Sequence, residues 1–289
     1  MSDKRPPGTL GVDLRKPGLR PCGLCGEVRE MTKAHVPPQV AGNRGRVTSA
    51  TVRVHNNVRS MGRLAAGGMW MRGLCGDCNS LAGLNYDTAY GDFAKAMDTY
   101  QRARSFLHLP PADPAPPVRV APGRVARSIL IGMFATTPQL RVMFPGLAAA
   151  LCEQRDHITL PDGASLRMAL YPLRRTRLAS MFNNYRVLGH RVYYNVFSEI
   201  YFRPLAWALI PSDRGYEEHM GESVFDGLGW ATVDEWLQYG NDVTAVDLRD
   251  LCRHGIPHVR HPLSGPEQDH WIQLFSDKIT AIIEGEIPG

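Results

Sequence analysis

Two Cys-x-x-Cys pairs constrain this chain more than any other feature. They are 49 residues apart and consist of Cys22, Cys25, Cys75 and Cys78. Two such pairs can place four thiolates around one tetrahedral zinc, because each pair can grip the metal from a tight turn. Glycines beside the cysteines favour such turns, since they tolerate positive φ angles and close backbone approach. The sequence therefore predicts a structural Zn²⁺ site, with the segment between the pairs as a structured insert.

The residues around these pairs extend the pattern. Thr32-x-x-His35 followed by Val36-Pro37-Pro38 lies after the first pair, and Asn79 directly follows Cys78. This order resembles that of the zinc-bearing HNH (ββα-metal) nucleases, over roughly residues 20–95. The resemblance implies an α+β fold, in which a zinc-stapled ββα-metal module precedes a mixed α+β domain.

The family resemblance also implies roles for single residues. His35 would be the general base that activates water, and Asn79 would help to hold a catalytic Mg²⁺ or Mn²⁺ on the scissile phosphate. Asn57, within His55-Asn56-Asn57, would steady the histidine loop, and His55 is a further candidate ligand or phosphate contact. Asp87 is a candidate carboxylate for the catalytic metal, because hard cations prefer oxygen ligands. The implied activity is hydrolysis of phosphodiester bonds in DNA, with RNA as an alternative substrate.

Alternatives stay open for the catalytic half of this hypothesis. His35 could be a loop histidine that packs against Pro37, and Asn79 could be the N-cap of its helix. Many family members have a metal ligand where this chain has Ala34, and some have one where it has Gly83. These two positions favour a catalytically degenerate HNH-fold protein that binds nucleic acid or regulates. An HNH scaffold repurposed for another substrate, such as a small molecule, is the third hypothesis.

Positive charge is concentrated in the first part of the chain. Residues 1–107 hold 16 Lys and Arg against 8 Asp and Glu, which leaves 17 against 20 for the remainder. A basic module favours a polyanion, and arginine suits bidentate contact with phosphate. The alternative is an ordinary solvated surface. The arginines that we expect to contact nucleic acid are Arg44, Arg46, Arg53, Arg59, Arg63 and Arg72.

Composition shifts divide the chain into four segments. We expect a flexible basic arm at 1–20, the HNH-like zinc module at 21–107, a Pro-rich linker at 108–120 and an α+β domain of unknown function at 121–289. That last domain would select substrate, sense a signal or form a homodimer. Periodicity predicts a helix over 79–104, with a break near Asn85-Tyr86-Asp87. Beyond the linker it predicts helices at 124–135, 146–154, 232–239 and 266–283, and strands at 165–172, 191–200 and 201–210.

Other features bound the protein class. No run of 18 apolar residues indicates a membrane span, and the first residues lack the apolar region of a secretory signal, so we expect a cytoplasmic protein. In that compartment paired thiols indicate zinc or redox chemistry, and no thioredoxin-like βαβ pattern surrounds them. We expect plain buried residues at Cys152 and Cys252.

Three further groups of residues have structural interpretations. Glycine and proline interrupt the segment that holds the C-terminal histidines, so we expect these to be scattered surface residues: His254, His258, His261 and His270. A solvated loop is expected for Arg174, Arg175 and Arg177. A half-buried sheet, rather than a base-stacking platform, is expected for Tyr193, Tyr194, Phe197, Tyr201 and Phe202.

Overall fold

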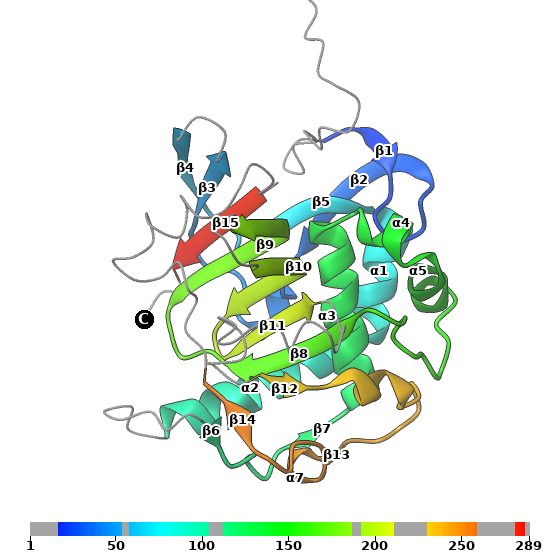
Figure 1. Cartoon of the computed structure of the whole chain (residues 1–289), viewed down its shortest axis with the longest axis vertical. Coiled ribbons are helices and arrows are strands. Elements are labelled where there is room, and N and C mark those ends of the chain that lie inside the picture. The colour runs from blue at the N-terminus through cyan, green and yellow to red at the C-terminus, as the bar shows by residue number, and fades with distance from the viewer. Residues whose placement is uncertain are drawn as a thin grey trace, which may run out of the picture.

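The computed structural model describes residues 17–53, 58–103, 112–186, 192–210, 230–258 and 281–286. These residues form a mixed α/β protein whose named strands all pair antiparallel (Figure 1). This part of the fold-class prediction is confirmed. Among the described residues, every helix falls short of the length or apolar character that a bilayer crossing requires.

The zinc-motif region is a three-stranded sheet followed by two helices. Its strand order is β1-β2-β5. The bounds are β1 Leu19–Pro21, β2 Val28–His35, β5 Trp70–Cys75, α1 Gly76–Asn85 and α2 Asp87–Arg102. The predicted helix break is confirmed, because buried Tyr86 separates α1 from α2. Helix α2 is amphipathic, with buried residues three or four positions apart at Tyr90, Phe93, Met97 and Gln101.

The insert between β2 and β5 contains a short helix and a hairpin, so it is structured, as the sequence predicts. The bounds are η1 Gln39–Ala41, β3 Val47–Arg53 and β4 Val58–Ala65. Strands β3 and β4 pair with each other in a separate two-stranded sheet.

Helix α3, Pro122–Thr136, joins the two parts of the chain. Thirteen of its 15 residues are buried, because it contacts α1, α2, β2 and β5 on one side and β9, β10 and η2 on the other. Figure 1 shows it in the middle of the molecule, between the sheets. One cluster of buried apolar side chains extends from the cysteine region through α3 to the second sheet.

The second sheet has six strands in the order β12-β8-β11-β10-β9-β15. The bounds are β8 Ser165–Leu170, β9 Arg175–Arg186, β10 Val192–Phe202, β11 Leu205–Ile210, β12 Ala231–Thr232 and β15 Ala281–Glu286. The three strands expected here from the sequence correspond to β8, β10 and β11. Two strands differ from expectation. The solvated loop expected around Arg174 is strand β9 from Arg175 on, and the end of the helix expected at 266–283 lies in β15.

Arg177 shows why the loop interpretation was wrong. Strand β9 pairs with β10 on one side and β15 on the other, so Arg177 lies inside the sheet and is only 2% exposed. Tyr201 of β10 lies opposite Arg177, and Glu199, two residues before Tyr201 on the same face, is fully buried. Burial raises the pKa of Glu199 to about 8, and the charge of Arg177 opposes that rise.

The described part of the predicted linker is extended, and it is also paired. Strand β6, Ala112–Asp113, pairs with β14, Ile256–Pro257, and β7, Arg119–Val120, pairs with β13, Val246–Asp247. The four-segment division stays a prediction, and these pairings tie the linker to the end of the chain.

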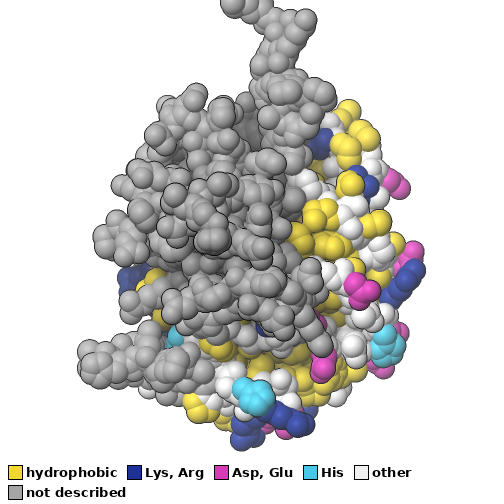
Figure 2. All heavy atoms as spheres, viewed as in Figure 1, with side chains coloured by type: hydrophobic (Ala, Val, Ile, Leu, Met, Phe, Trp, Pro, Cys, Tyr) yellow, Lys and Arg dark blue, Asp and Glu magenta, His cyan; other side chains and the backbone are white. Residues whose placement is uncertain are grey.

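Four short helical elements complete the described part of the chain: α4 Leu140–Met143, α5 Pro145–Cys152, η2 Asp234–Gln238 and α7 Leu248–Leu251. The helices expected at 124–135 and 146–154 correspond to α3 and α5. The helix expected at 232–239 is the shorter η2, which begins after Val233 without a side-chain cap, since Thr232 lies in β12. Figure 2 shows exposed apolar side chains over the region of β1, β2 and α4, where Leu19, Val28 and Val142 are exposed.

Candidate metal centre and histidine loop

The four predicted cysteines come together where three elements meet. The first pair follows β1, Cys75 ends β5, and Cys78 lies in the first turn of α1. Their sulfur atoms all lie within 4.8 Å of one another, and the sulfurs of Cys25 and Cys75 are 3.9 Å apart. A tetrahedral zinc with Zn–S bonds of about 2.3 Å holds sulfurs about 3.8 Å apart. The four-cysteine cluster is confirmed, and its geometry is compatible with zinc.

Backbone hydrogen bonds shape the turn that carries the first pair. The Cys22 N–H donates to the Glu27 carbonyl at 2.9 Å, and the Gly26 N–H donates to the Cys22 carbonyl at 3.0 Å. Gly26 has a φ of 81°, so the turn needs a residue without a side chain there. The Cys75 N–H lies 3.4 Å from the Cys22 sulfur. Because a hydrogen bond to sulfur favours the thiolate, this contact prepares Cys22 for a metal.

Two glycines let α3 pack directly against this turn. The Gly23 N–H donates to the Gly73 carbonyl at 2.7 Å. A Cβ at Gly23 would lie 2.4 Å from the carbonyl oxygen of Phe134, and one at Gly73 would lie 1.9 Å from that of Ala135. Neither distance is compatible with a side chain. The C-terminal end of α3 therefore rests on the backbone of the cysteine turns.

A fifth thiol lies beside the cluster, which corrects the prediction that Cys152 is isolated. Cys152, at the end of α5, is half-buried and hydrogen-bonds with Cys78, and this contact lowers the pKa of Cys152. Sequence spacing gave no signal for this, because Cys152 lies 74 residues after Cys78. Cys252 is a plain buried residue, as predicted, and burial raises the pKa of its thiol to about 11.

His35 ends strand β2 and lies opposite Trp70 of β5. Its Nε2 is 3.0 Å from the Gly67 carbonyl oxygen and 3.0 Å from the Gln39 amide nitrogen. The Gly67 carbonyl can only accept and the Gln39 amide nitrogen can only donate, so the two contacts belong to opposite tautomers of the ring. In the tautomer that donates to Gly67, the lone pair lies on Nδ1. Burial, aided by the charge of Lys33, lowers the pKa of His35 below its ordinary 6.5. The neutral imidazole is the form that a general base requires.

Asn43 ties down the loop that follows His35. Its Nδ2 donates to the carbonyls of Pro37 at 2.6 Å and Met69 at 2.8 Å, and its Oδ1 accepts the Met69 N–H at 2.6 Å. Asn43 is 1% exposed, and Gly68 comes so close that a Cβ there would lie 2.2 Å from the Asn43 carbonyl oxygen. Asn43 is not among the residues that the sequence analysis singles out. The asparagine itself was the available signal, because its amide can satisfy donors and acceptors together.

Asn79 lies within the first turn of α1, and Cys75 holds the N-cap position, so the capping alternative for Asn79 is wrong. Its Nδ2 donates to the Lys33 carbonyl, two residues before His35, at 3.2 Å. The bond joins α1 to the strand that carries the histidine, and it leaves the amide oxygen of Asn79 for another partner.

Asp87 begins α2, and its Oδ1 accepts a hydrogen bond from Ser128 Oγ at 2.8 Å. Burial raises the pKa of this carboxyl group. Its other oxygen, Oδ2, lies 4.0 Å from where a Cβ at Gly83 would be. Gly83 is the position, one helical turn after Asn79, where some HNH nucleases have a ligand. Within the described ranges, the four cysteines are the one group of three or more His, Cys, Asp or Glu side chains close enough to share a metal.

The remaining predicted residues divide by location. His55 and Asn57 lie outside the described residues, as do His261 and His270. Arg53, Arg59 and Arg63 lie in strands β3 and β4, and their side chains are outside the description. Arg44 and Arg46 are exposed in the loop after η1.

Arg72 is half-buried and contacts its own sheet. Its Nη1 donates to the Met31 carbonyl at 2.9 Å, and its guanidinium lies 5.8 Å from the Trp70 ring centre. Lys33, which sequence reasoning did not single out, lies 4.7 Å from the same centre. The indole of Trp70, which lies opposite His35 across the strand pair, thus contacts two cations.

The C-terminal histidines and the aromatic strand residues have structural roles where they are described. His254 is exposed, whereas His258 is 9% exposed and bridges to Leu170, so a scattered surface set is wrong for His258. Tyr201 and Phe202 are buried in β10.

No protein-family model, curated protein or solved structure matches this chain. The arrangement of its own residues is therefore the basis for any functional conclusion.

Proposed function

We propose that this chain is a metal-dependent endonuclease of the HNH type, which hydrolyses phosphodiester bonds in DNA and has RNA as a second substrate class. One observation carries the proposal. The zinc-compatible cluster joins the start of α1 to the paired strands β2 and β5, and His35 at the end of β2 has a lowered pKa. A rigid support of this kind is what a catalytic side chain needs.

In this mechanism His35 takes a proton from the water that attacks phosphorus, using the lone pair on Nδ1. The Gly67 carbonyl fixes the orientation of the ring, and Asn43 fixes the loop behind it. Asn79 would offer its amide oxygen to Mg²⁺ or Mn²⁺, which when bound supplies charge stabilisation at the scissile phosphate. Zinc in the cysteine cluster would stabilise the fold, and it would take no part in the chemistry.

The test is cleavage of supercoiled plasmid and of labelled single-stranded and duplex oligonucleotides with Mg²⁺ or Mn²⁺. We expect wild type to cut and His35→Ala to lose at least a hundredfold in rate, in the range that general bases contribute. His35→Ala should keep one zinc per chain and an unchanged melting temperature within a few degrees, which separates lost chemistry from lost fold. If wild type cuts none of these substrates with either metal, the nuclease proposal fails.

A second candidate, a catalytically degenerate HNH-fold protein that binds nucleic acid, is favoured by a specific observation. Ala34 is 3% exposed and offers no ligand, and Gly83 offers none on α1. Tight nucleic-acid binding without cleavage by the zinc-loaded protein would support this candidate over the nuclease.

A further inference from the structure

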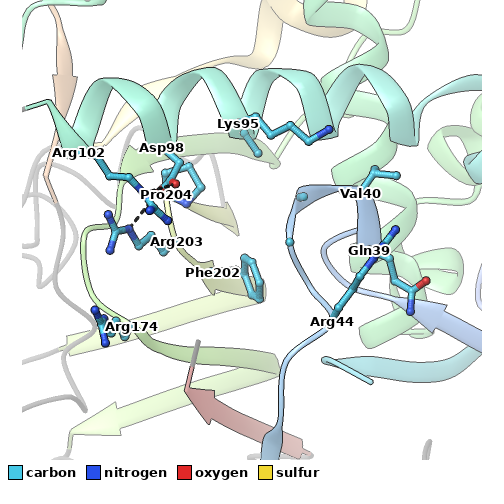
Figure 3. Close-up of a pocket in the computed structure, with 13 residues that line it drawn as sticks. Gln39, Val40, Arg44, Lys95, Asp98, Arg102, Arg174, Phe202, Arg203 and Pro204 are labelled. Carbon is cyan, nitrogen blue, oxygen red and sulfur yellow. Dashed lines mark hydrogen bonds and ion pairs between the residues drawn. The ribbon is translucent and has the colours of Figure 1, made fainter. Parts of the chain in front are cut away.

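A basic groove lies between α2, the η1 loop and the β10–β11 turn. Its volume is about 640 Å³, and residues far apart in the sequence line it. Figure 3 shows the side chains of α2 along one wall, those of the η1 loop along another, and Arg174 and Arg203 on the third side. Phe202 and Pro204, both buried, contribute apolar surface to the lining.

The groove has five cationic side chains and one carboxylate. The cations are Arg44, Lys95, Arg102, Arg174 and Arg203. Asp98 is the single acid, and it accepts from Arg102 Nε at 2.6 Å and from Arg203 Nε at 3.0 Å. One carboxylate thus orients two guanidinium groups without neutralising the lining.

Two of the arginines are available to a ligand. Arg44 and Arg174 are exposed, and within the described part of the chain neither side chain makes an ion pair or hydrogen bond. They come from opposite sides of the groove, as Figure 3 shows. In Figure 3 the Arg44 side chain runs toward Gln39, and Arg174 lies at the opposite end of the groove. Exposed guanidinium groups at the two ends of one groove suit phosphate oxygens, which they can bind in a bidentate manner.

The groove begins beside the loop that follows His35. Gln39 lines it, and the amide nitrogen of Gln39 is 3.0 Å from His35 Nε2. Arg44 directly follows Asn43, whose three hydrogen bonds fix the backbone there. An extended ligand lying in the groove, such as a nucleic acid strand, would therefore continue towards His35.

We propose that this groove binds the phosphodiester backbone of the nucleic acid strand next to the phosphate that His35 would attack. The ligand is a polynucleotide, and the contacts are to phosphate oxygens, so binding depends on salt and little on base sequence. This inference rests on the proposed function for the location of the attacked phosphate. It adds Arg174, Arg203, Lys95 and Arg102, three of which come from outside the resembling motifs, to the interface.

The test measures fluorescence anisotropy of a labelled 20-nucleotide single strand between 50 and 200 mM KCl, with zinc-loaded full-length protein and no added Mg²⁺ or Mn²⁺. The groove variant is Arg44→Ala combined with Arg174→Ala. The control combines Arg155→Ala with Arg253→Ala, which removes the same charge from exposed residues outside the groove lining. We expect the groove variant to raise Kd about tenfold at 100 mM KCl. Its salt slope should fall by about 0.7 for each lost contact, and the control should match wild type.

Several outcomes would overturn the inference. One is equal loss in groove and control variants, which would indicate charge alone. Others are an unchanged Kd and slope for the groove variant, absence of binding by wild type, or full displacement of the strand by AMP, which would make the ligand a mononucleotide. The proposed function fails separately. Binding that the groove variant weakens, without cleavage under any metal, supports the groove and contradicts the nuclease. If the wild type cleaves and the groove variant binds and cleaves equally well, the nuclease is supported and the groove is contradicted.

Discussion

Asn43 holds both backbone groups of Met69, accepting its N–H at 2.6 Å and donating to its carbonyl at 2.8 Å. The Met69 carbonyl also accepts the Val36 N–H at 3.0 Å. Val36 directly follows His35, and Met69 directly precedes Trp70, which pairs with His35. One buried amide therefore closes the loop on both sides of the candidate base.

Replacing Asn43 with alanine should destabilise the protein and slow any cleavage. The change leaves the Met69 N–H and the Pro37 carbonyl without the partner that Asn43 supplies, which costs about 2 kcal/mol or more in unfolding free energy. Urea unfolding measures this loss. Asn85→Ala is the control, because Asn85 is exposed and donates only to the Leu81 carbonyl, so its effect should stay within about 0.5 kcal/mol. Equal losses in the two variants would contradict the role given to Asn43.

The amount of bound zinc should depend on the four clustered cysteines. We expect one zinc per chain by elemental analysis, and its loss in Cys75→Ser, since three thiolates hold a structural zinc poorly. Cys252→Ser should keep the metal. Cys152→Ser should also keep it, because Cys152 contacts Cys78 from outside the group of four.

Metal removal gives an independent check on the same cluster. A zinc chelator should lower the melting temperature, and added zinc should restore it. Loss of zinc from Cys152→Ser would instead make Cys152 a ligand, and a zinc-free wild type would contradict the site.

Gly73→Ala should disrupt the contact between α3 and the cysteine turns. Its Cβ would lie 1.9 Å from the backbone oxygen of Ala135, and backbone on both sides must then move. Overpacking of this kind costs about 1–3 kcal/mol, measured by urea unfolding. Gly146→Ala is the matched control in α5, where a Cβ would meet no atom within 4 Å. A Gly73→Ala protein as stable as the Gly146→Ala protein would show that α3 does not depend on this approach.

The lowered pKa of His35 sets a pH dependence. Cleavage needs the neutral ring, so the rate should hold as pH falls to 6.5 and decline only as pH passes through the lower pKa. An NMR titration of the His35 ring measures the same pKa independently of any cleavage assay. The unfolded chain binds this proton more readily, so unfolding free energy should also decrease as pH falls below 6.5. A ring that titrates at or above 6.5 would contradict the burial of His35.

Local signals predicted the features that depend on local chemistry. The cysteine spacing predicted the metal cluster, and the interrupted periodicity around Tyr86 predicted the boundary between α1 and α2. Features that depend on tertiary contacts gave no such signal. Cys152 approaches Cys78 only because α3, α4 and α5 fold back onto the cysteine turns.

The errors in the second half have the same origin. Charge around Arg174 and Arg177 indicated a solvated loop, yet strand pairing on both sides places Arg177 beside Glu199 inside the sheet. The groove likewise could not be predicted, because Arg44 and Arg174 are brought to one hollow by α2 and the β10–β11 turn. The HNH roles of His35 and Asn79 stay predictions until cleavage is measured.

The contact of α3 with Gly23 and Gly73 has a consequence for anyone who would use the cysteine region as a separate module. A chain divided in the proline-rich stretch would remove the backbone of Phe134 and Ala135 from those glycines and expose the apolar side chains that α3 covers. The fragment that contains the four cysteines would then be prone to aggregate. Chimeras and truncations should keep residues 17–136 together.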